Sequence, residues 1–378
     1  MEVRMRNRPQ TSALVSACLA LALALLLVVS AAASAAVHRK PASHRKSAAK
    51  KQPPLYWGAW IGDQLTGEEP PWDMSAVSQF QGVVGGKGLS LIALGSPFAD
   101  CSSPPCNFFQ FPTEAMNNVH NYGAIPFFNW ASQATSSDPA GATVMPDFQL
   151  SDVIAGTYDS YIREFAEAAR NWGHSFFLRY DWEMNGNWFP WGAGINGNNP
   201  GEYVAAWRHV HDIFTAVGAT NATWVWCPYS EVDRHFAALA PLYPGDEYVD
   251  WTCMDGFNWG SNPTNPHTWK GFKEIFGPTY RRLTKQIAPS KPVVLAEMAS
   301  TGHGRAKASW ITNMFKELST NFRRIRGLIW FDQVDRGVEW PLEASPPAAR
   351  AFAKGVRKRS FKGNGQAAVV ASPIQPPR

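Results

Sequence analysis

Short apolar runs recur along the chain and alternate with segments that have helical periodicity. Eight such runs lie at Leu55–Ile61, Leu89–Leu94, Ala124–Trp130, Ser175–Arg179, Thr223–Cys227, Trp251–Phe257, Pro292–Glu297 and Ile325–Phe331. Most are continuously apolar, which is typical of parallel strands that are buried on both faces. The segments Asp152–Trp172, Tyr203–Val217 and Gly271–Ile287 place apolar residues at helical spacing and a polar face opposite. Alternating strands and helices predict a parallel sheet of the α/β class.

Eight strands are the number that a closed (β/α)8 barrel needs, and such barrels take about 250 residues or more. We therefore predict a single domain, a (β/α)8 TIM barrel, over residues 55–357. A doubly wound open sheet is the alternative. The Gly-rich phosphate-binding turn that many such sheets carry does not follow the first apolar run.

The first 36 residues have the pattern of an export signal. Three arginines precede the apolar run Ala13–Val29, and Ala33-Ser34-Ala35 offers small residues for cleavage. We predict a signal peptide over residues 1–36 and a secreted protein. The alternative is an uncleaved membrane anchor, since the apolar stretch is almost long enough to span a bilayer.

Basic segments flank the middle of the chain and account for its net charge of +5. Residues 37–54 predict a basic disordered linker, and residues 358–378 predict a disordered tail. We interpret the charge as belonging to solvated ends and not to a track for phosphates. The middle is rich in the 17 tryptophans of the chain, whose flat rings suit sugar rings as well as bases.

Four cysteines follow the one in the export signal, Cys18. Cys101 and Cys106 bracket a short turn, and we predict that they form a disulfide because export leads to an oxidising compartment. Cys227 and Cys253 lie near the ends of neighbouring predicted strands, where they could be bonded or be two buried thiols. The spacing of the four is wrong for a zinc site.

Carboxylates, amides, arginine and tryptophan gather where the predicted strands end, and that rim carries function in (β/α)8 barrels. Cleavage of a glycosidic bond needs one carboxyl group that protonates the leaving oxygen and another that attacks the anomeric carbon or activates water. Glu183 and Glu297 fit these roles by position. Arg179 could keep Glu297 ionised by lowering its pKa, or it could be a structural ion-pair partner. Aromatic neighbours would raise the pKa of Glu183 by desolvation.

The remaining candidates divide by their predicted position. We interpret Asp181, Asp255 and Asp332 as supporting carboxylates or rim groups, because Glu has the longer reach towards a sugar. Trp172, Trp207 and Trp310 lie on predicted helices and are expected to pack, whereas Trp130, Trp188, Trp259 and Trp330 lie on the rim and are expected to stack on sugar.

The segment from Arg179 to Gly192 resembles glycoside hydrolase family 26, the β-mannanase family of the large retaining (β/α)8 clan. The shared pattern is Arg179, then Glu183-Met184-Asn185-Gly186, then Trp188-Phe189. Further similarity lies in Tyr243–Asp246, Asp255–Asn258 and Lys291–Glu297, and the resemblance covers most of Tyr56–Phe352.

The resemblance implies that Glu183 is the acid/base and Glu297 the nucleophile of a retaining mechanism, with carboxylates about 5–5.5 Å apart. It also implies that Arg179, Asn185, Trp188 and Trp330 shape or contact the sugar at the cleavage point. There are two departures: Trp182 stands where the family has His, and Phe257, a further candidate for substrate binding, stands where it commonly has Tyr. Both weaken the assignment to mannan and suit a more apolar pocket.

The resulting hypothesis is an endo-acting β-glycanase whose first candidate substrate is β-1,4-mannan. Alternatives are a β-glucanase or β-xylanase of the same fold, or a catalytically inactive carbohydrate-binding barrel. We expect a monomer that needs neither cofactor nor metal. Its partner would be a polysaccharide and not nucleic acid or, after signal cleavage, a membrane.

Overall fold

The computed structural model describes residues 52–378, except 69, 136–142, 232–235, 262–266, 304–305 and 336. The predicted signal peptide, Cys18 and nearly all of the predicted linker lie outside the described residues. Over the ranges that the structure describes, none of the helices combines the length and apolar character needed to cross a membrane.

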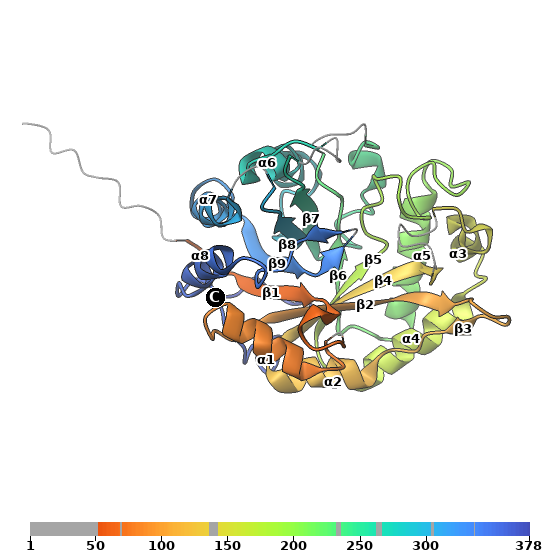
Figure 1. Cartoon of the computed structure of the whole chain (residues 1–378). Coiled ribbons are helices and arrows are strands. Elements are labelled where there is room, and N and C mark those ends of the chain that lie inside the picture. Colours follow the sequence, from red (N-terminus) through yellow and green to blue (C-terminus); the bar gives the residue numbers. More distant parts are fainter. Residues whose placement is uncertain are drawn as a thin grey trace, which may run out of the picture. The chain divides into compact units, whose positions relative to one another are not determined.

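Eight parallel strands form a closed barrel, which confirms the predicted fold (Figure 1). They are β1 (Tyr56–Ile61), β2 (Leu91–Asp100), β4 (Ile125–Ala134), β5 (Phe176–Tyr180), β6 (Ala222–Trp226), β7 (Trp251–Asn258), β8 (Val293–Ser300) and β9 (Ile325–Asp332). Each of the eight predicted runs is a strand. The sheet closes where β1 pairs with β2, at Gly58 opposite Leu91. A Cβ atom on Gly58 would overlap the Leu91 carbonyl, so this closure depends on glycine.

Helices follow most strands and cover the outside of the barrel. They are α1 (Met74–Val83), α2 (Thr113–Tyr122), α3 (Leu150–Ile154), α4 (Asp159–Trp172), α5 (Glu202–Ala216), α6 (Phe272–Arg282), α7 (Lys307–Thr320) and α8 (Pro346–Val356). The segment predicted as one helix over Asp152–Trp172 is broken between α3 and α4. Gly156 lies in that break with a φ of 84°, a left-handed conformation that ends a right-handed helix.

Short elements complete the description of the chain. They are the antiparallel strand β3 (Asn107–Phe108), the hairpin of β10 (Val334–Asp335) and β11 (Val338–Glu339), the 3₁₀ turns Asp63–Leu65, Pro146–Phe148 and Ala240–Leu242, and a π turn at Leu283–Ile287 that extends α6. The hairpin follows β9 directly and so belongs to the rim where the strands end.

The C-terminal tail is ordered, so the prediction of disorder over 358–378 was wrong. Ile374 is fully buried and belongs to the cluster that fills the inside of the barrel. The Trp251 indole donates to the Ile374 carbonyl at 2.7 Å, and the Ile374 N–H donates to the Thr223 hydroxyl at 2.9 Å. Trp251 and Thr223 lie where β7 and β6 begin, so the tail covers the end of the barrel from which the strands start (Figure 1).

Further contacts along the tail move the end of the domain well beyond residue 357. Phe361 is buried and forms a bridge with Leu55 just before β1. The Tyr56 hydroxyl donates to the Gln375 carbonyl at 3.0 Å, and Arg326 donates to the Pro377 carbonyl at 2.6 Å. The tail therefore belongs to the barrel domain.

Candidate active site

A cavity of about 390 Å³ opens at the end of the barrel where the strands finish. Glu183, which follows β5, and Glu297, which lies within β8, both line it. Aromatic rings make up much of the remaining wall: Trp60, Trp182, Trp188, Phe189, Tyr229, Phe236, Phe257, Trp259 and Phe331. The two predicted catalytic carboxylates, which are far apart in the sequence, therefore face the same cavity.

Glu183 is held by its neighbours in an uncommon backbone conformation. Its φ is +56°, a left-handed value that is costly for a residue with a side chain and that is concentrated at functional sites. Its N–H donates to the Cys227 carbonyl at 2.6 Å, so the end of β6 fixes this turn. The Trp188 indole donates to the Glu183 Oε2 at 2.6 Å and orients the carboxyl group.

The surroundings of Glu183 favour its protonated form. Burial, followed by the negative charge of Glu297, raises the pKa of Glu183 to about 7, against the opposing influence of Arg179 and Trp188. A carboxyl group with this pKa can hold a proton near neutral pH and release it during a reaction. This is the behaviour predicted for Glu183 from its aromatic company.

Glu297 reaches the cavity because β8 is irregular at this point. Ala296 already points into the barrel interior, so regular alternation would turn Glu297 outwards. The pairing of β8 with both neighbouring strands shifts register here, a bulge that turns Glu297 inwards as well. Its side chain is 13% exposed, enough to meet a ligand in the cavity.

Arg179 lies beneath the two glutamates and pairs with carboxylates on two strands. It donates to the Glu297 Oε1 at 2.5 Å and contacts the Asp255 carboxylate directly. Burial alone would lower the pKa of Arg179, but Asp255 and Glu297 outweigh it and raise that pKa. Arg179 is fully buried and does not line the cavity, so of its two predicted roles, shaping the site or contacting the sugar, the geometry favours the first. The expected pairing with Glu297 is confirmed.

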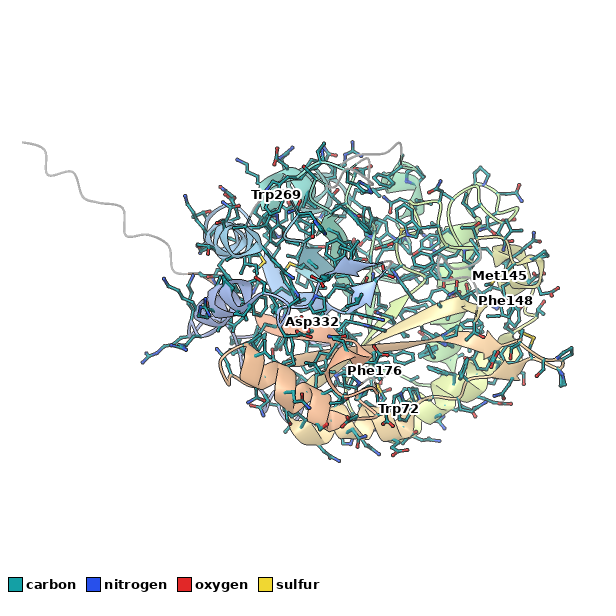
Figure 2. The ribbon with its side chains drawn as sticks, viewed as in Figure 1. Trp72, Met145, Phe148, Phe176, Trp269 and Asp332 are labelled. Atoms are coloured by element: carbon teal, nitrogen blue, oxygen red, sulfur yellow. A yellow bond between two sulfur atoms is a disulfide. The ribbon has the colours of Figure 1, made fainter. Side chains whose placement is uncertain are left out.

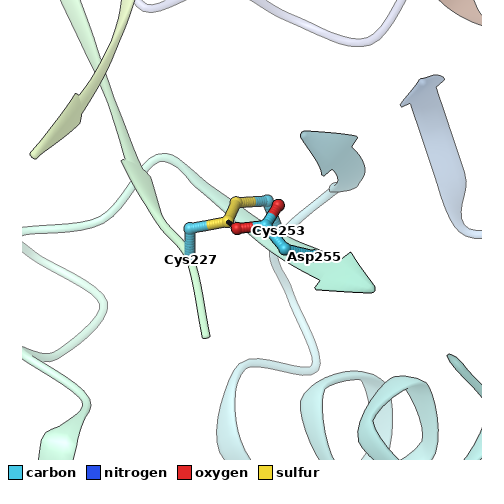
Figure 3. Close-up of side chains that lie close together, drawn as sticks. All are labelled: Cys227, Cys253 and Asp255. Atoms are coloured by element: carbon cyan, nitrogen blue, oxygen red, sulfur yellow. Dashed lines mark hydrogen bonds between the residues drawn. A yellow bond between two sulfur atoms is a disulfide. The ribbon is translucent and has the colours of Figure 1, made fainter. Parts of the chain in front are cut away.

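A disulfide joins Cys227 and Cys253 next to Asp255, which resolves the alternative between bonded and free thiols (Figure 3). Both cysteines are fully buried, and the bond ties the end of β6 to β7 below the carboxylates. Within the described parts of the chain, Cys227, Cys253 and Asp255 are the one group with the spacing of metal ligands. Sulfurs that are bonded to each other do not supply the thiolates that a metal would need. The predicted disulfide between Cys101 and Cys106 is also present.

The predicted rim aromatics split into two groups. Trp188, Phe257 and Trp259 line the cavity, as expected. Trp130 and Trp330 do not, because both are fully buried and face the surrounding helices.

The outward direction of Trp130 and Trp330 is set by alternation along the strands. Trp130 stacks on Phe165 of α4, with ring centroids 4.2 Å apart, and Trp330 packs edge-on against Phe352 of α8. Successive side chains of a strand point to opposite faces, so the adjacent residues Asn129 and Phe331 line the cavity instead. Strand parity is the signal that would have found them.

Asn185, predicted to shape or contact the sugar site, does not line the cavity and supports it from behind. Its side chain donates to the Tyr229 carbonyl at 3.0 Å and accepts from the Tyr229 N–H at 2.9 Å. The amide nitrogen and oxygen both hold Tyr229, which does line the cavity.

The buried aspartates also support the site from outside the cavity. Asp181 accepts hydrogen bonds from the N–H and the hydroxyl of Ser132, and Asp332 accepts from the Leu342 N–H. Asp181, Asp255 and Asp332 are absent from the cavity wall, in agreement with their interpretation as supporting carboxylates.

Asn129 offers a polar group to a ligand. Its side chain is 3% exposed and lines the cavity, and its Oδ1 atom accepts no hydrogen bond from the described protein. Leaving a buried acceptor unpaired costs about 1–3 kcal/mol, which a donor on a bound molecule would recover. A sugar hydroxyl is such a donor.

Comparison with known proteins agrees with this geometry. The sequence model of glycosyl hydrolase family 26 matches residues 123–300, which include both glutamates. Endoglucanase H of Acetivibrio thermocellus is 30% identical over 301 residues, which are 79% of this chain and 30% of that protein. Mannan endo-1,4-beta-mannosidase A and B of Caldalkalibacillus mannanilyticus is 31% identical over 134 residues, 34% of this chain and 22% of that protein. The chain thus spans less than a third of either relative.

Solved structures share the barrel at low sequence identity. The catalytic domain of a family 26 endo-beta-1,4-mannanase from Bacillus sp. JAMB-750 superposes with a TM-score of 0.63 at 16% identity. The match covers 85% of this chain and 90% of that domain. At this identity the likeness supports the (β/α)8 fold alone.

Proposed function

Because the chain belongs to glycosyl hydrolase family 26, we propose that it is a retaining, endo-acting glycosidase that cleaves β-linkages inside a plant-type polysaccharide. One observation carries the proposal. Glu183, with a pKa raised to about 7, and Glu297, paired with Arg179, line the same aromatic cavity. A proton donor and a charged nucleophile are the two groups that retaining glycosidases need.

In the first step, a Glu297 oxygen attacks the anomeric carbon and the glycosidic bond breaks. Glu183 gives its proton to the departing oxygen, so the leaving sugar departs as an alcohol and Glu183 becomes a carboxylate. Arg179 holds the Glu297 carboxyl group in place for the attack through its 2.5 Å hydrogen bond.

In the second step, water attacks the same carbon and Glu183 accepts a proton from it, which releases Glu297 as a carboxylate. The charge of Glu297 is one of the causes that raise the pKa of Glu183. Glu297 loses that charge when it forms the glycosyl ester, so the pKa of Glu183 falls at that moment. The same residue can therefore act first as an acid and then as a base.

The first candidate substrate is β-1,4-mannan, which the mannosidase relative is named for. Aromatic walls suit the apolar faces of its sugar rings, and Asn129 and Glu297 supply groups that can accept hydrogen bonds from hydroxyls.

A β-glucan is the second candidate, favoured by the apolar residues Trp182 and Phe257 in the cavity wall. These are the positions where the chain departs from the mannanase pattern. Endoglucanase H also matches over more than twice the length that the mannosidase does, 301 against 134 residues. A glucose unit differs from mannose at the 2-hydroxyl, so loss of polar partners near the cleavage point would weaken that discrimination.

We also propose that the protein is secreted as a monomer. The arginines and apolar run at the N-terminus support export, as do the two disulfides among the described residues, since such bonds persist in oxidising compartments.

Product analysis on a panel of mannan, lichenan and β-1,3-xylan tests the function. We expect release of reducing ends from one of them, a mixture of chain lengths from internal cleavage, and a first product that keeps the β configuration. Glu297→Ala should lower kcat by about 10⁴-fold or more, because the attacking group is gone. Binding of a polysaccharide without cleavage would instead support the inactive carbohydrate-binding barrel, and an inverted product would contradict the covalent mechanism.

A further inference from the structure

A second hollow of about 330 Å³ adjoins the active-site cavity. Trp60, Gly95 and Ser96 line both spaces, so the two hollows share a wall at the ends of β1 and β2. The Trp60 indole donates to the Gln333 side chain at 2.7 Å, which fixes the ring at this junction. The two hollows therefore adjoin at Trp60, Gly95 and Ser96.

Trp72, which is labelled in Figure 2, lines this second hollow. Its ring is 58% exposed, and it is the one aromatic residue among the strongly exposed large apolar side chains of the described chain. Leaving an indole in water forgoes the free energy that its burial would release. An aromatic ring that is exposed in the free protein, beside a sugar-sized cavity, is expected where a bound ligand covers that ring.

The loop that carries Trp72 is anchored before any ligand binds. Pro70 and Pro71 are buried, and the Asn118 side chain of α2 donates to the Pro71 carbonyl at 2.9 Å. The loop that carries Trp72 therefore needs no large rearrangement to meet a ligand, which lowers the entropic cost of binding.

The rest of the hollow has the amphipathic character of a sugar site. Phe109 and Phe111 contribute apolar surface, and the exposed side chains of Gln110, Thr113 and Glu114 supply polar groups around it. Sugar rings present apolar faces and hydroxyl edges, and binding sites for such ligands combine aromatic walls with a few placed polar groups.

We propose that this hollow is a distal subsite in which further sugar units of the same β-glycan chain stack on Trp72. The inference rests on the proposed function, since the occupant is a continuation of the substrate held at Glu183 and Glu297. It would make the protein prefer long chains over short ones.

Binding measurements in a Glu297→Ala background test the subsite without cleavage. β-1,4-Mannooligosaccharides of two to six units, and the corresponding series prepared from lichenan, are titrated calorimetrically into Glu297→Ala and into the double variant that also carries Trp72→Ala. In whichever of the two series binds, we expect Trp72→Ala to lower the affinity for the longest oligosaccharide by about tenfold. The affinity for oligosaccharides of two or three units should change less than twofold. Trp72→Phe keeps a flat ring and should stay within about threefold.

Two results would overturn the subsite: an equal loss of affinity at every chain length, or no loss with the longest chain. Retardation of the protein in gels that contain mannan or lichenan adds a readout for intact polysaccharide, and Trp72→Ala should be retarded less than the parent. Hydrolysis by the wild type is scored separately. If it cleaves nothing while Trp72→Ala still weakens binding to long chains, the proposed function fails and the subsite stands.

Discussion

The two ends of the barrel are built from opposite kinds of contact. Where the strands finish, Arg179, Asp255 and Glu297 form a buried charged cluster under an open cavity. Where the strands begin, the C-terminal tail closes the barrel with Ile374, a fully buried aliphatic side chain. Burying charges costs free energy that apolar packing does not, so the first end is arranged for chemistry and the second for stability.

Strained backbone accompanies the charged cluster at the open end of the barrel. Glu183 and Asp181, with φ values of 56° and 40°, lie in the turn that follows β5 at the open end. A non-glycine residue in this region costs about 1–3 kcal/mol and persists only if its surroundings hold it. Two features supply the stability that such a turn needs. They are the hydrogen bond from Glu183 to the Cys227 carbonyl, next to the disulfide, and the apolar closure at the far end.

Replacing Arg179 should have the largest effect, because it breaks the cluster that defines the open end. Arg179→Met leaves Asp255, Glu297 and Glu183 close together without a cation, and we expect a loss of about 3–5 kcal/mol in the free energy of unfolding. Denaturant titration measures that loss, and kcat should fall at least a hundredfold. The double variant Arg179→Met/Asp255→Asn removes one of the carboxyl groups left without a cation and should recover part of the stability. Equal stability of the single and double variants would contradict the charged-cluster interpretation.

Truncating Ile374 should have the next largest effect and should separate stability from activity. Ile374→Ala leaves a void in a closed apolar space, for which we expect a loss of about 2–4 kcal/mol in the free energy of unfolding. The activity well below the melting temperature should stay within twofold, since no residue of the cavity moves. Val369→Ala, an aliphatic truncation in the same tail at a 73% exposed position, is the control and should change stability by less than about 0.5 kcal/mol. A fall in kcat with Ile374→Ala would show that the ends are coupled.

Sequence reasoning predicted the barrel more fully than it predicted the cavity wall. The eight continuous apolar runs identified every barrel strand because parallel strands are buried on both faces. That same uniformity hides which residues face inwards, and so Trp130 and Trp330 were assigned to the rim while Asn129 and Phe331 were missed. Glu297 was identified by its position at the strand end, although the bulge that turns it inwards has no local signal.

The tail shows a different limit of sequence reasoning. Its prolines and its basic, polar composition are typical of disorder, and Ile374 is isolated between prolines and polar residues. Its burial depends on a gap at the far end of the barrel that only the assembled fold creates. Likewise, the polar pairing of Asn185 with Tyr229 depends on two loops that are distant in the sequence.

Changing Glu183 to Gln should stabilise the open end in a pH-dependent way. The folded-state pKa of Glu183 is raised from 4.5 to about 7, so its favourable contribution is complete below pH 4.5 and is lost as the pH rises through 7. Glu183→Gln lacks this loss, and we expect its free energy of unfolding to exceed that of the wild type by about 2–3 kcal/mol above pH 7. The difference should shrink towards pH 4.5. Glu164→Gln, at an exposed position on α4, is the matched control, and a difference that is independent of pH would contradict the assignment.

The smallest expected effect is a shift in the pKa of Glu183, the proton donor at the open end. The Trp188 indole donates to Glu183 at 2.6 Å and favours the carboxylate, so it holds the pKa of Glu183 below the value that burial alone would set. Trp188→Phe removes the donor and keeps a ring, and the pKa of Glu183 should rise. Since Glu183 must be protonated for the first step, the alkaline limb of the kcat/KM profile should move upwards by about half to one pH unit. Trp259→Phe is the control, because its indole donates to the Tyr229 hydroxyl and not to Glu183. Trp259→Phe should lower kcat/KM without moving the alkaline limb. If the alkaline limb of Trp188→Phe stays in place or moves to lower pH, Glu183 is not the acid.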